Sequence, residues 1–104
     1  PTPFSVPDAP GQPHMAATPE TEEALRLDRR ARATVQRRLA LAGFDPRGFD
    51  GVFGPNTRGA IADFQAAWGF PATGYLEESV RDELNLRTED AYQAMRLRST
   101  ATAA

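Results

Sequence analysis

One stretch of eighteen residues, from Gly48 to Gln65, constrains the fold of this chain more than any other. It reads GFDGVFGPNTRGAIADFQ: an Asp-Gly turn, a Gly-Pro pair, and then an apolar stripe at helical spacing. Proline is well suited to the first position of a helix, where its missing N–H is not needed and its fixed φ matches the helix. The stretch therefore predicts a helix that begins at Gly54-Pro55 and follows a loop of defined shape.

The loop itself carries the signal of a β-hairpin, because Asp50-Gly51 lies between two apolar residues. Its flanks are interrupted by glycine and proline, so we expect an ordered loop with at most a very short ladder. The side chain of Asp50 can accept backbone N–H bonds in its own turn, and Gly51 can adopt angles that other residues resist. We expect Phe49 and Phe53 to enter the core between the helices.

Apolar periodicity predicts an all-α fold, a small three-helix bundle with a long ordered loop between the first two main helices and short flanking helical segments. Thr18-Pro19-Glu20 marks a helix start and Asp28 a second one. Residues 20–42 form one helix or two with a break near Leu27-Asp28, and we favour two.

The second main helix should end at Gly69. The third should run from Leu76 or Glu77 to Leu84 or Asn85, and Thr88 should cap a last segment in which Tyr92, Met95 and Leu97 pack back. The predicted buried stripes are Ala31, Val35, Leu39 and Ala42, then Thr57, Ala60, Ile61, Phe64 and Trp68, then Leu76, Val80 and Leu84.

Composition divides the chain into three parts. Six of its nine prolines fall in residues 1–19, which predicts a flexible Pro-rich tail or linker there. Residues 20–98 form the predicted helical domain, and residues 99–104 are expected to be a disordered tail. A folded part of this size is marginal but sufficient when its helices are well capped.

Charge and residue types exclude several classes of function. The net charge of −2 argues against a nucleic-acid binder. No cysteine is present to form disulfides or thiolate metal sites, and no apolar run approaches the length of a membrane span. The arginines at positions 26, 29, 30, 32, 37 and 38 are spread around the helix, so we interpret them as a solvated surface.

No group in the loop forms a convincing reaction centre or ion site. Asp45 and Asp50 are weak evidence for carboxylate catalysis, so no catalytic residue is predicted. Alignment of Gly51 with the invariant glycine of an EF-hand leaves three ligand positions without a suitable oxygen, which rejects calcium. The glycines before the helix lack the Gly-Lys-Ser/Thr of a phosphate-binding loop. We therefore predict no metal and no cofactor. A carboxylate or phosphate at this helix start remains open, with Arg58 in its first turn.

Residues 35–84 resemble the peptidoglycan-binding-domain-like family. The resemblance rests on a helix pattern, a loop-helix pattern and a final turn, and one departure is Ala42, where many relatives carry a larger apolar residue. The matching residues are Val35, Gln36, Leu39 and Gly43, then Asp50 to Gly54 with Thr57, Ala60, Ile61, Phe64 and Gln65, then Gly69 and Thr73-Gly74.

The resemblance implies a three-helix, non-catalytic module that binds bacterial cell-wall peptidoglycan and anchors an attached envelope enzyme or other protein. Its partners would be glycan strands or stem peptides, in the periplasm or outside the cell, with no nucleic acid and no membrane insertion. The alternative is a protein–protein docking module, which a large apolar patch on the second main helix would favour. The predicted ligand-binding residues are Gly54, Asn56, Thr57, Arg58, Tyr75 and Trp68, and the predicted loop-structuring residues are Asp50, Gly51, Phe53 and Gln65.

Overall fold

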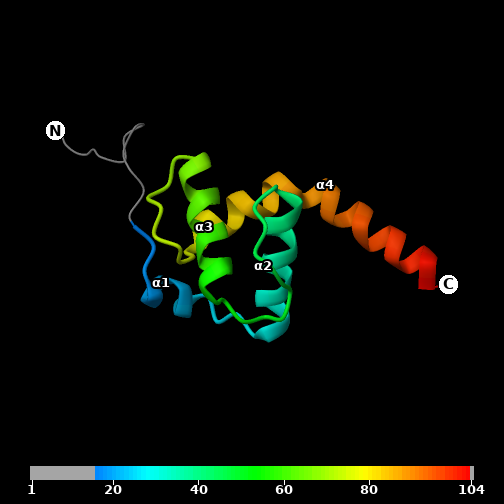
Figure 1. Cartoon of the computed structure of the whole chain (residues 1–104), viewed down its shortest axis with the longest axis horizontal. Helices are drawn as coiled ribbons and strands as arrows, with labels where there is room; N and C mark the ends of the chain where they lie inside the picture. Colours follow the sequence, from blue (N-terminus) through cyan, green and yellow to red (C-terminus); the bar gives the residue numbers. More distant parts are fainter. Residues whose placement is uncertain (1–15, 104) are drawn as a thin grey trace.

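A computed structural model describes residues 16–103, and the predicted linker of residues 1–15 lies outside this range. The described residues form four helices and no strand, so the all-helical prediction is confirmed. The helices are α1 (Pro19–Ala24), α2 (Arg29–Leu41), α3 (Pro55–Ala67) and α4 (Glu78–Ala103) (Figure 1).

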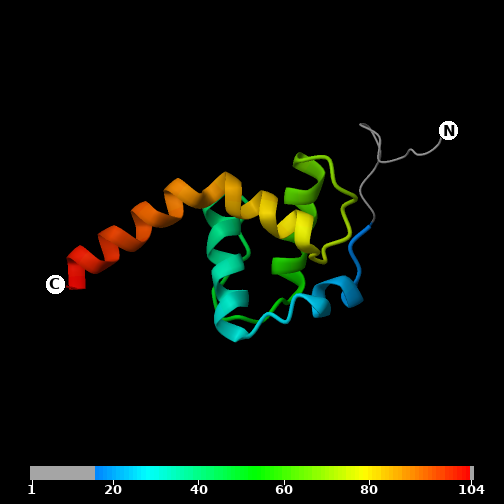
Figure 2. The same cartoon turned by 180° about the vertical axis from the view of Figure 1, so that it is seen from behind.

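Helices α2 and α3 lie side by side and point in the same direction, which requires the chain to return between them (Figures 1 and 2). The loop of residues 42–54 makes this return along the length of α2. Helix α4 crosses both helices on one face, and its C-terminal half extends beyond them. The long loop is therefore placed against α2 before it enters α3.

The core is formed where the apolar faces of the three long helices meet. Phe64 is fully buried at its centre, and its ring packs edge-on against Phe44 with 5.8 Å between centroids. The predicted stripes supply most of this core, but Trp68 is 42% exposed and does not belong to it. The buried apolar residues are Val35, Leu39, Ala60, Ile61, Phe64, Phe70, Leu76, Val80 and Leu84.

Two separate helices form where the sequence left one or two open. Thr18 caps α1 in a capping box with Thr21, and Asp28 caps α2 by accepting a hydrogen bond from Ala31 N–H. Between them Arg26 adopts the left-handed conformation with φ of +56°. Ala17 is already buried, so the folded part begins before the residue 20 that composition predicted.

The last predicted break, at Thr88, is wrong: α4 is one continuous helix from Glu78 to Ala103. Thr88 is buried, and its hydroxyl donates to the carbonyl of Leu84 one turn earlier instead of capping a new helix. No glycine or proline follows Gly74, so nothing in the sequence interrupts the helix. Helix also replaces the predicted disorder over residues 99–103, and Leu97 is 69% exposed instead of packing back.

Candidate functional site

The loop before α3 is organised by one buried amide side chain, that of Gln36 in the middle of α2. Its Oε1 accepts a hydrogen bond from Gly51 N–H at 2.8 Å, and its Nε2 donates to the carbonyl of Val52 at 3.0 Å. The same Nε2 lies 3.0 Å from Thr57 Oγ1 in the first turn of α3. Gln36 is 1% exposed, so these partners replace water for an otherwise unsatisfied amide.

Asp50 and Gly51 complete the turn that Gln36 holds. The carboxylate of Asp50 accepts from Val52 N–H at 3.0 Å. This bond, and after it one from the Gln36 amide, lowers the pKa of Asp50 below its ordinary value of 3.8. Gly51 has φ of +81°, and a Cβ there would lie 2.5 Å from the carbonyl oxygen of Arg29. Only glycine therefore allows the turn to approach the start of α2.

The phenylalanines of the loop contribute less than predicted. Phe53 is partly buried and packs on the edge of the core, between the guanidinium groups of Arg32 and Arg58. Phe49 is 43% exposed, so its predicted place in the core is wrong. The guanidinium of Arg37 covers its ring at 4.6 Å. The shape of the loop thus depends on the Gln36 amide more than on two buried rings.

A small cavity of about 130 Å³ lies between this loop and the N-terminus of α3, and we call it the loop hollow. Asn56 is exposed at its edge, whereas Thr57 is 2% exposed and bonded to Gln36. Gly54 is the N-cap of α3 and provides no side-chain cap. The hollow thus offers first-turn amides and the exposed polar side chains of Arg47, Asp50 and Asn56. It is lined by Gln36, Pro46, Arg47, Gly48, Asp50, Val52, Gly54, Pro55, Asn56 and Thr57.

Gln65 holds a second loop in the same way as Gln36 holds the first. It is fully buried, and its Oε1 accepts from Gly74 N–H at 2.8 Å while its Nε2 donates to the carbonyl of Tyr75 at 2.8 Å. Both bonds go to the loop between α3 and α4 and not to residues 50–57. Each long loop of the domain is therefore fixed by one glutamine of the helix that precedes it.

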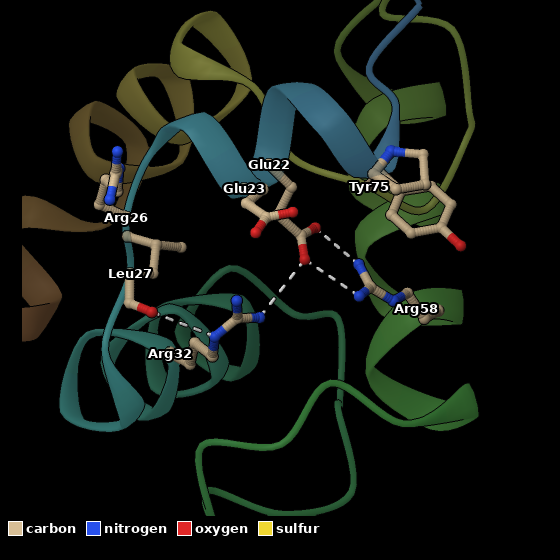
Figure 3. A pocket seen from close by; sticks show the side chains of 8 residues that line it. Glu22, Glu23, Arg26, Leu27, Arg32, Arg58 and Tyr75 are labelled. Carbon is tan, nitrogen blue, oxygen red and sulfur yellow. Dashed lines mark hydrogen bonds and ion pairs between the residues drawn. The ribbon is translucent and has the colours of Figure 1, made fainter.

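A larger cavity of about 670 Å³ opens beside α1, and we call it the α1 groove (Figure 3). It is bordered on one side by α1 and on another by the start of α2. Its third border is formed by Arg58 in the first turn of α3 and Tyr75 in the loop before α4. The residues that line it are Pro19, Glu22, Glu23, Arg26, Leu27, Arg32, Arg58 and Tyr75.

Glu22 joins the three borders of the α1 groove. Arg58 approaches its carboxylate with two nitrogens, Nη1 at 2.6 Å from Oε1 and Nη2 at 3.0 Å from Oε2. Arg32 Nη1 lies 3.4 Å from Oε2 (Figure 3). The backbone N–H of Leu76 donates to Oε1 at 3.0 Å. Glu22 is 4% exposed, so a buried charge is here matched by two cations and an amide. The hydroxyl of Thr21 donates to the carbonyl of Leu76, so α1 is fastened to both backbone polar groups of that residue.

The residues predicted to bind ligand are distributed over three places. Asn56, with Gly54 and Thr57, lies at the loop hollow. Arg58 and Tyr75 lie together in the α1 groove, with the guanidinium 4.3 Å from the ring centroid. Trp68 is the C-cap at the opposite end of α3 and lies under the guanidinium of Arg87 at 4.0 Å.

The structural roles of Gln36 and Glu22 were not predicted from the sequence, and the assignment of Arg38 to the solvated surface was wrong. The sequence did contain an indication that Gln36 is buried and hydrogen-bonded, because it is a polar residue next to Val35 on a helix that faces the core. It contained no such indication for Glu22 beyond its place in the first turn of α1. Arg38, interpreted as solvated, is 8% exposed and donates to Thr88 Oγ1 at 3.0 Å, which joins α2 to α4.

Within residues 16–103, no group of three or more His, Cys, Asp or Glu side chains is arranged to hold a metal ion. No helix of this part of the chain has the length and apolar character needed to cross a membrane.

Comparison with protein families places this architecture among known domains. Residues 28–84, more than half of the 104 residues, match the family model described as "Putative peptidoglycan binding domain". The match begins at the cap of α2 and ends inside α4, so α1 and the second half of α4 lie outside it. Searches of curated proteins and of solved structures found no match.

Proposed function

The chain belongs to the peptidoglycan binding domain family, and from this membership we propose that it binds peptidoglycan without catalysing a reaction on it. The family match over residues 28–84 is the observation that carries the proposal. The family is one of binding domains, and a ligand of this kind implies a role in the bacterial cell envelope.

We further propose that the domain anchors an attached envelope enzyme or other protein, in the periplasm or outside the cell. Peptidoglycan is an insoluble polymer with many repeated sites. A module with one shallow site then gains retention from rebinding and from its tether, even when each contact is weak. The docking alternative needs a broad apolar patch on α3. Among the described residues, Trp68 at the C-cap is the only large exposed hydrophobic side chain of that helix, so we retain peptidoglycan as the partner.

The proposed contact surface includes the sequence-predicted residues that are accessible. Asn56 and the first-turn amides of α3 would take polar groups of the ligand, and Tyr75 and Trp68 would pack against sugar faces. Arg58 would act through the α1 groove, where it is 29% exposed and already bound to Glu22. The role of Thr57 would be indirect, through the shape of the loop.

Co-sedimentation with purified sacculi tests the proposal. The folded protein should appear in the pellet with sacculi and stay in the supernatant without them. A double variant, Asn56→Ala with Trp68→Ala, should keep its helical circular dichroism and its Tm within a few degrees and lose a large part of the bound fraction. Failure of the folded wild type to sediment with sacculi would reject peptidoglycan binding.

A further inference from the structure

The α1 groove is a charged hollow that the family match does not account for. Five of its eight lining residues precede residue 28, where the match begins. The groove therefore depends on α1 and on the turn after it, which are additions to the matched region. The contacts of Glu22 with Arg58 and Leu76 keep this addition in place.

The charges of the groove favour an anion. Its lining contains three guanidinium groups, from Arg26, Arg32 and Arg58, against the two carboxylates of Glu22 and Glu23. The groove is thus locally positive, although the chain carries a net charge of −2. Glu22 is satisfied by its partners, which leaves the cations at the rim to attract a ligand from solution.

Two of the groove's arginines have donors to spare. Arg26 is exposed, and among the described residues its side chain makes no hydrogen bond, ion pair or ring contact. Arg32 uses Nη1 for Glu22 and Nε for the carbonyl of Leu27, which leaves Nη2 without a described partner. A carboxylate can accept from two guanidinium groups. Figure 3 shows Arg26 turned away from Arg32, so its exposed side chain has to rotate toward the groove to share a ligand with Arg32.

The backbone at Arg26 adds an independent observation. It follows the C-cap Leu25 of α1 with φ of +56°, in the left-handed position where helices usually carry glycine. An L side chain is disfavoured there, because its Cβ comes close to the following carbonyl oxygen. Arginine at this position therefore stabilises the fold less than glycine would. What arginine provides in exchange is a guanidinium group that lines the groove and can bind an anion.

The lining also includes surface for the rest of a peptide. The ring of Tyr75, which Arg58 covers on one face, borders the groove together with Leu27 and Pro19. The cavity of about 670 Å³ has room for two or three small residues. A small apolar side chain beside a terminal carboxylate matches this combination of wall and cations.

We propose that the α1 groove binds the C-terminal carboxylate of a short peptide, and, on the premise that the domain binds peptidoglycan, that this peptide is the stem of the cell-wall polymer. Arg32 binds the carboxylate, and the exposed Arg26 turns toward it from the position that Figure 3 shows. Tyr75, on the far side of Glu22, contacts a side chain nearer the N-terminus of the peptide. The glycan strand is then bound at the loop hollow and Trp68, and Tyr75 contacts the peptide and not a sugar face.

The first experiment is an NMR titration with N-acetyl-Ala-Ala as the free acid and, in parallel, as the C-terminal amide. The free acid should shift the signals of Arg26, Arg32 and Tyr75, and the amide should bind at least about tenfold more weakly, because it lacks the charge. Equal binding of acid and amide, or shifts confined to the loop hollow, would overturn the proposal.

The variant is Arg26→Gly, which removes the guanidinium and relieves the left-handed backbone at once. Its Tm should equal or exceed that of the wild type, whereas its affinity for the free acid should fall roughly five- to tenfold. The matched control is Arg47→Gly, which removes an equal charge at another left-handed residue, with φ of +64°, beside the loop hollow. It should bind the acid as the wild type does. Loss of binding in Arg47→Gly and not in Arg26→Gly would place the carboxylate at the loop hollow.

Sacculi separate this inference from the proposed function. Sacculi stripped of their stem peptides should retain less wild-type protein than intact sacculi, and Arg26→Gly should abolish that difference. Equal retention by both kinds of sacculi would overturn the stem-peptide inference and leave peptidoglycan binding in place. Binding of the free acid without any retention on sacculi would reject the proposed function and keep the carboxylate site.

Discussion

The loop hollow and the α1 groove are both fixed by one buried polar side chain, but the two side chains differ in kind. Gln36 holds the loop with a neutral amide whose partners are mostly backbone groups. Glu22 holds α1 with a charge, and its partners are two arginines and one amide. The first arrangement leaves a cavity of about 130 Å³ and the second one of about 670 Å³.

The difference teaches which region is scaffold and which has spare binding capacity. An amide that is fully paired inside a turn has little left to offer a ligand, so the loop acts mainly to place α3. A buried carboxylate needs cations around it, and those cations have more donors than one carboxylate accepts. The ionic region therefore presents unused guanidinium donors at its rim, whereas the amide region presents the first-turn amides of α3 and the side chains of Arg47 and Asn56.

The strongest test of this contrast is Gln36→Ala. The substitution leaves Gly51 N–H and the Val52 carbonyl without their partner, and it opens a cavity, so we expect a loss of about 3 kcal/mol in the free energy of unfolding. For a domain of this size that lowers the Tm by roughly 15 °C. Urea or thermal unfolding followed by circular dichroism measures both.

The matched control is Gln93→Ala on α4, where the amide is exposed and bonds only to Glu89. It should change the unfolding free energy by less than about 0.5 kcal/mol. A Gln36→Ala variant as stable as this control would show that the loop does not depend on the amide.

The corresponding change in the α1 groove is Glu22→Gln, with an expected loss of about 2 kcal/mol. The expected loss of unfolding free energy is smaller than for Gln36→Ala because Arg32 and Arg58 are each more than a quarter exposed and can be solvated by water. We expect α1 to detach locally, so trypsin should cleave faster after Arg26 while the core unfolds with its cooperativity intact.

Glu23→Gln provides the control for this change, since Glu23 is the exposed neighbour on the same helix. It should leave both the proteolysis rate and the Tm unchanged. Unchanged proteolysis in Glu22→Gln would mean that the ion network is not what holds α1.

The smallest expected effect is the pH dependence of the loop through Asp50. The hydrogen bond from Val52 N–H, followed by that from Gln36, lowers the pKa of Asp50 below 3.8 in the folded state. The unfolded state then binds more protons between the two pKa values, so the stabilisation is complete above 3.8 and is lost as the pH falls through the folded pKa. Unfolding of the wild type and of Asp50→Asn, compared at pH 6 and at pH 3, should show a smaller decrease for the variant. An equal decrease in both would exclude this contribution.

Much of the fold followed from local patterns, because these patterns are themselves local physics. Gly54-Pro55 and Asp28 begin helices where they were predicted to, since a cap or a first-turn proline acts within one turn. The predicted helix start at Thr88 was wrong because threonine is found both at N-caps and inside helices, where its hydroxyl donates to a carbonyl one turn earlier. Thr88 lies in a stretch without glycine or proline, and it is buried against Arg38, which comes from fifty residues away in the chain.

The candidate site was less predictable for the same reason. Residues at the start of α3 were predicted to bind ligand, but their pairing was not predicted: Arg58 was expected to be free for a ligand and is bound to Glu22. The two are separated by 36 residues, and no periodicity connects them. The α1 groove could not be anticipated, since it exists only after α1 packs beside Leu76.

By itself the sequence determined that the chain is helical, where most of its helices begin and end, and which family its middle resembles. These properties depend on backbone angles, caps and apolar spacing, which act over one or two turns. The tertiary structure alone decided that Gln36 and Gln65 hold the loops, that Thr88 is buried against Arg38, and that a positive groove forms beside α1. Those outcomes depend on which buried polar groups meet, and such meetings are set by the packing of distant segments and not by any short stretch of residues.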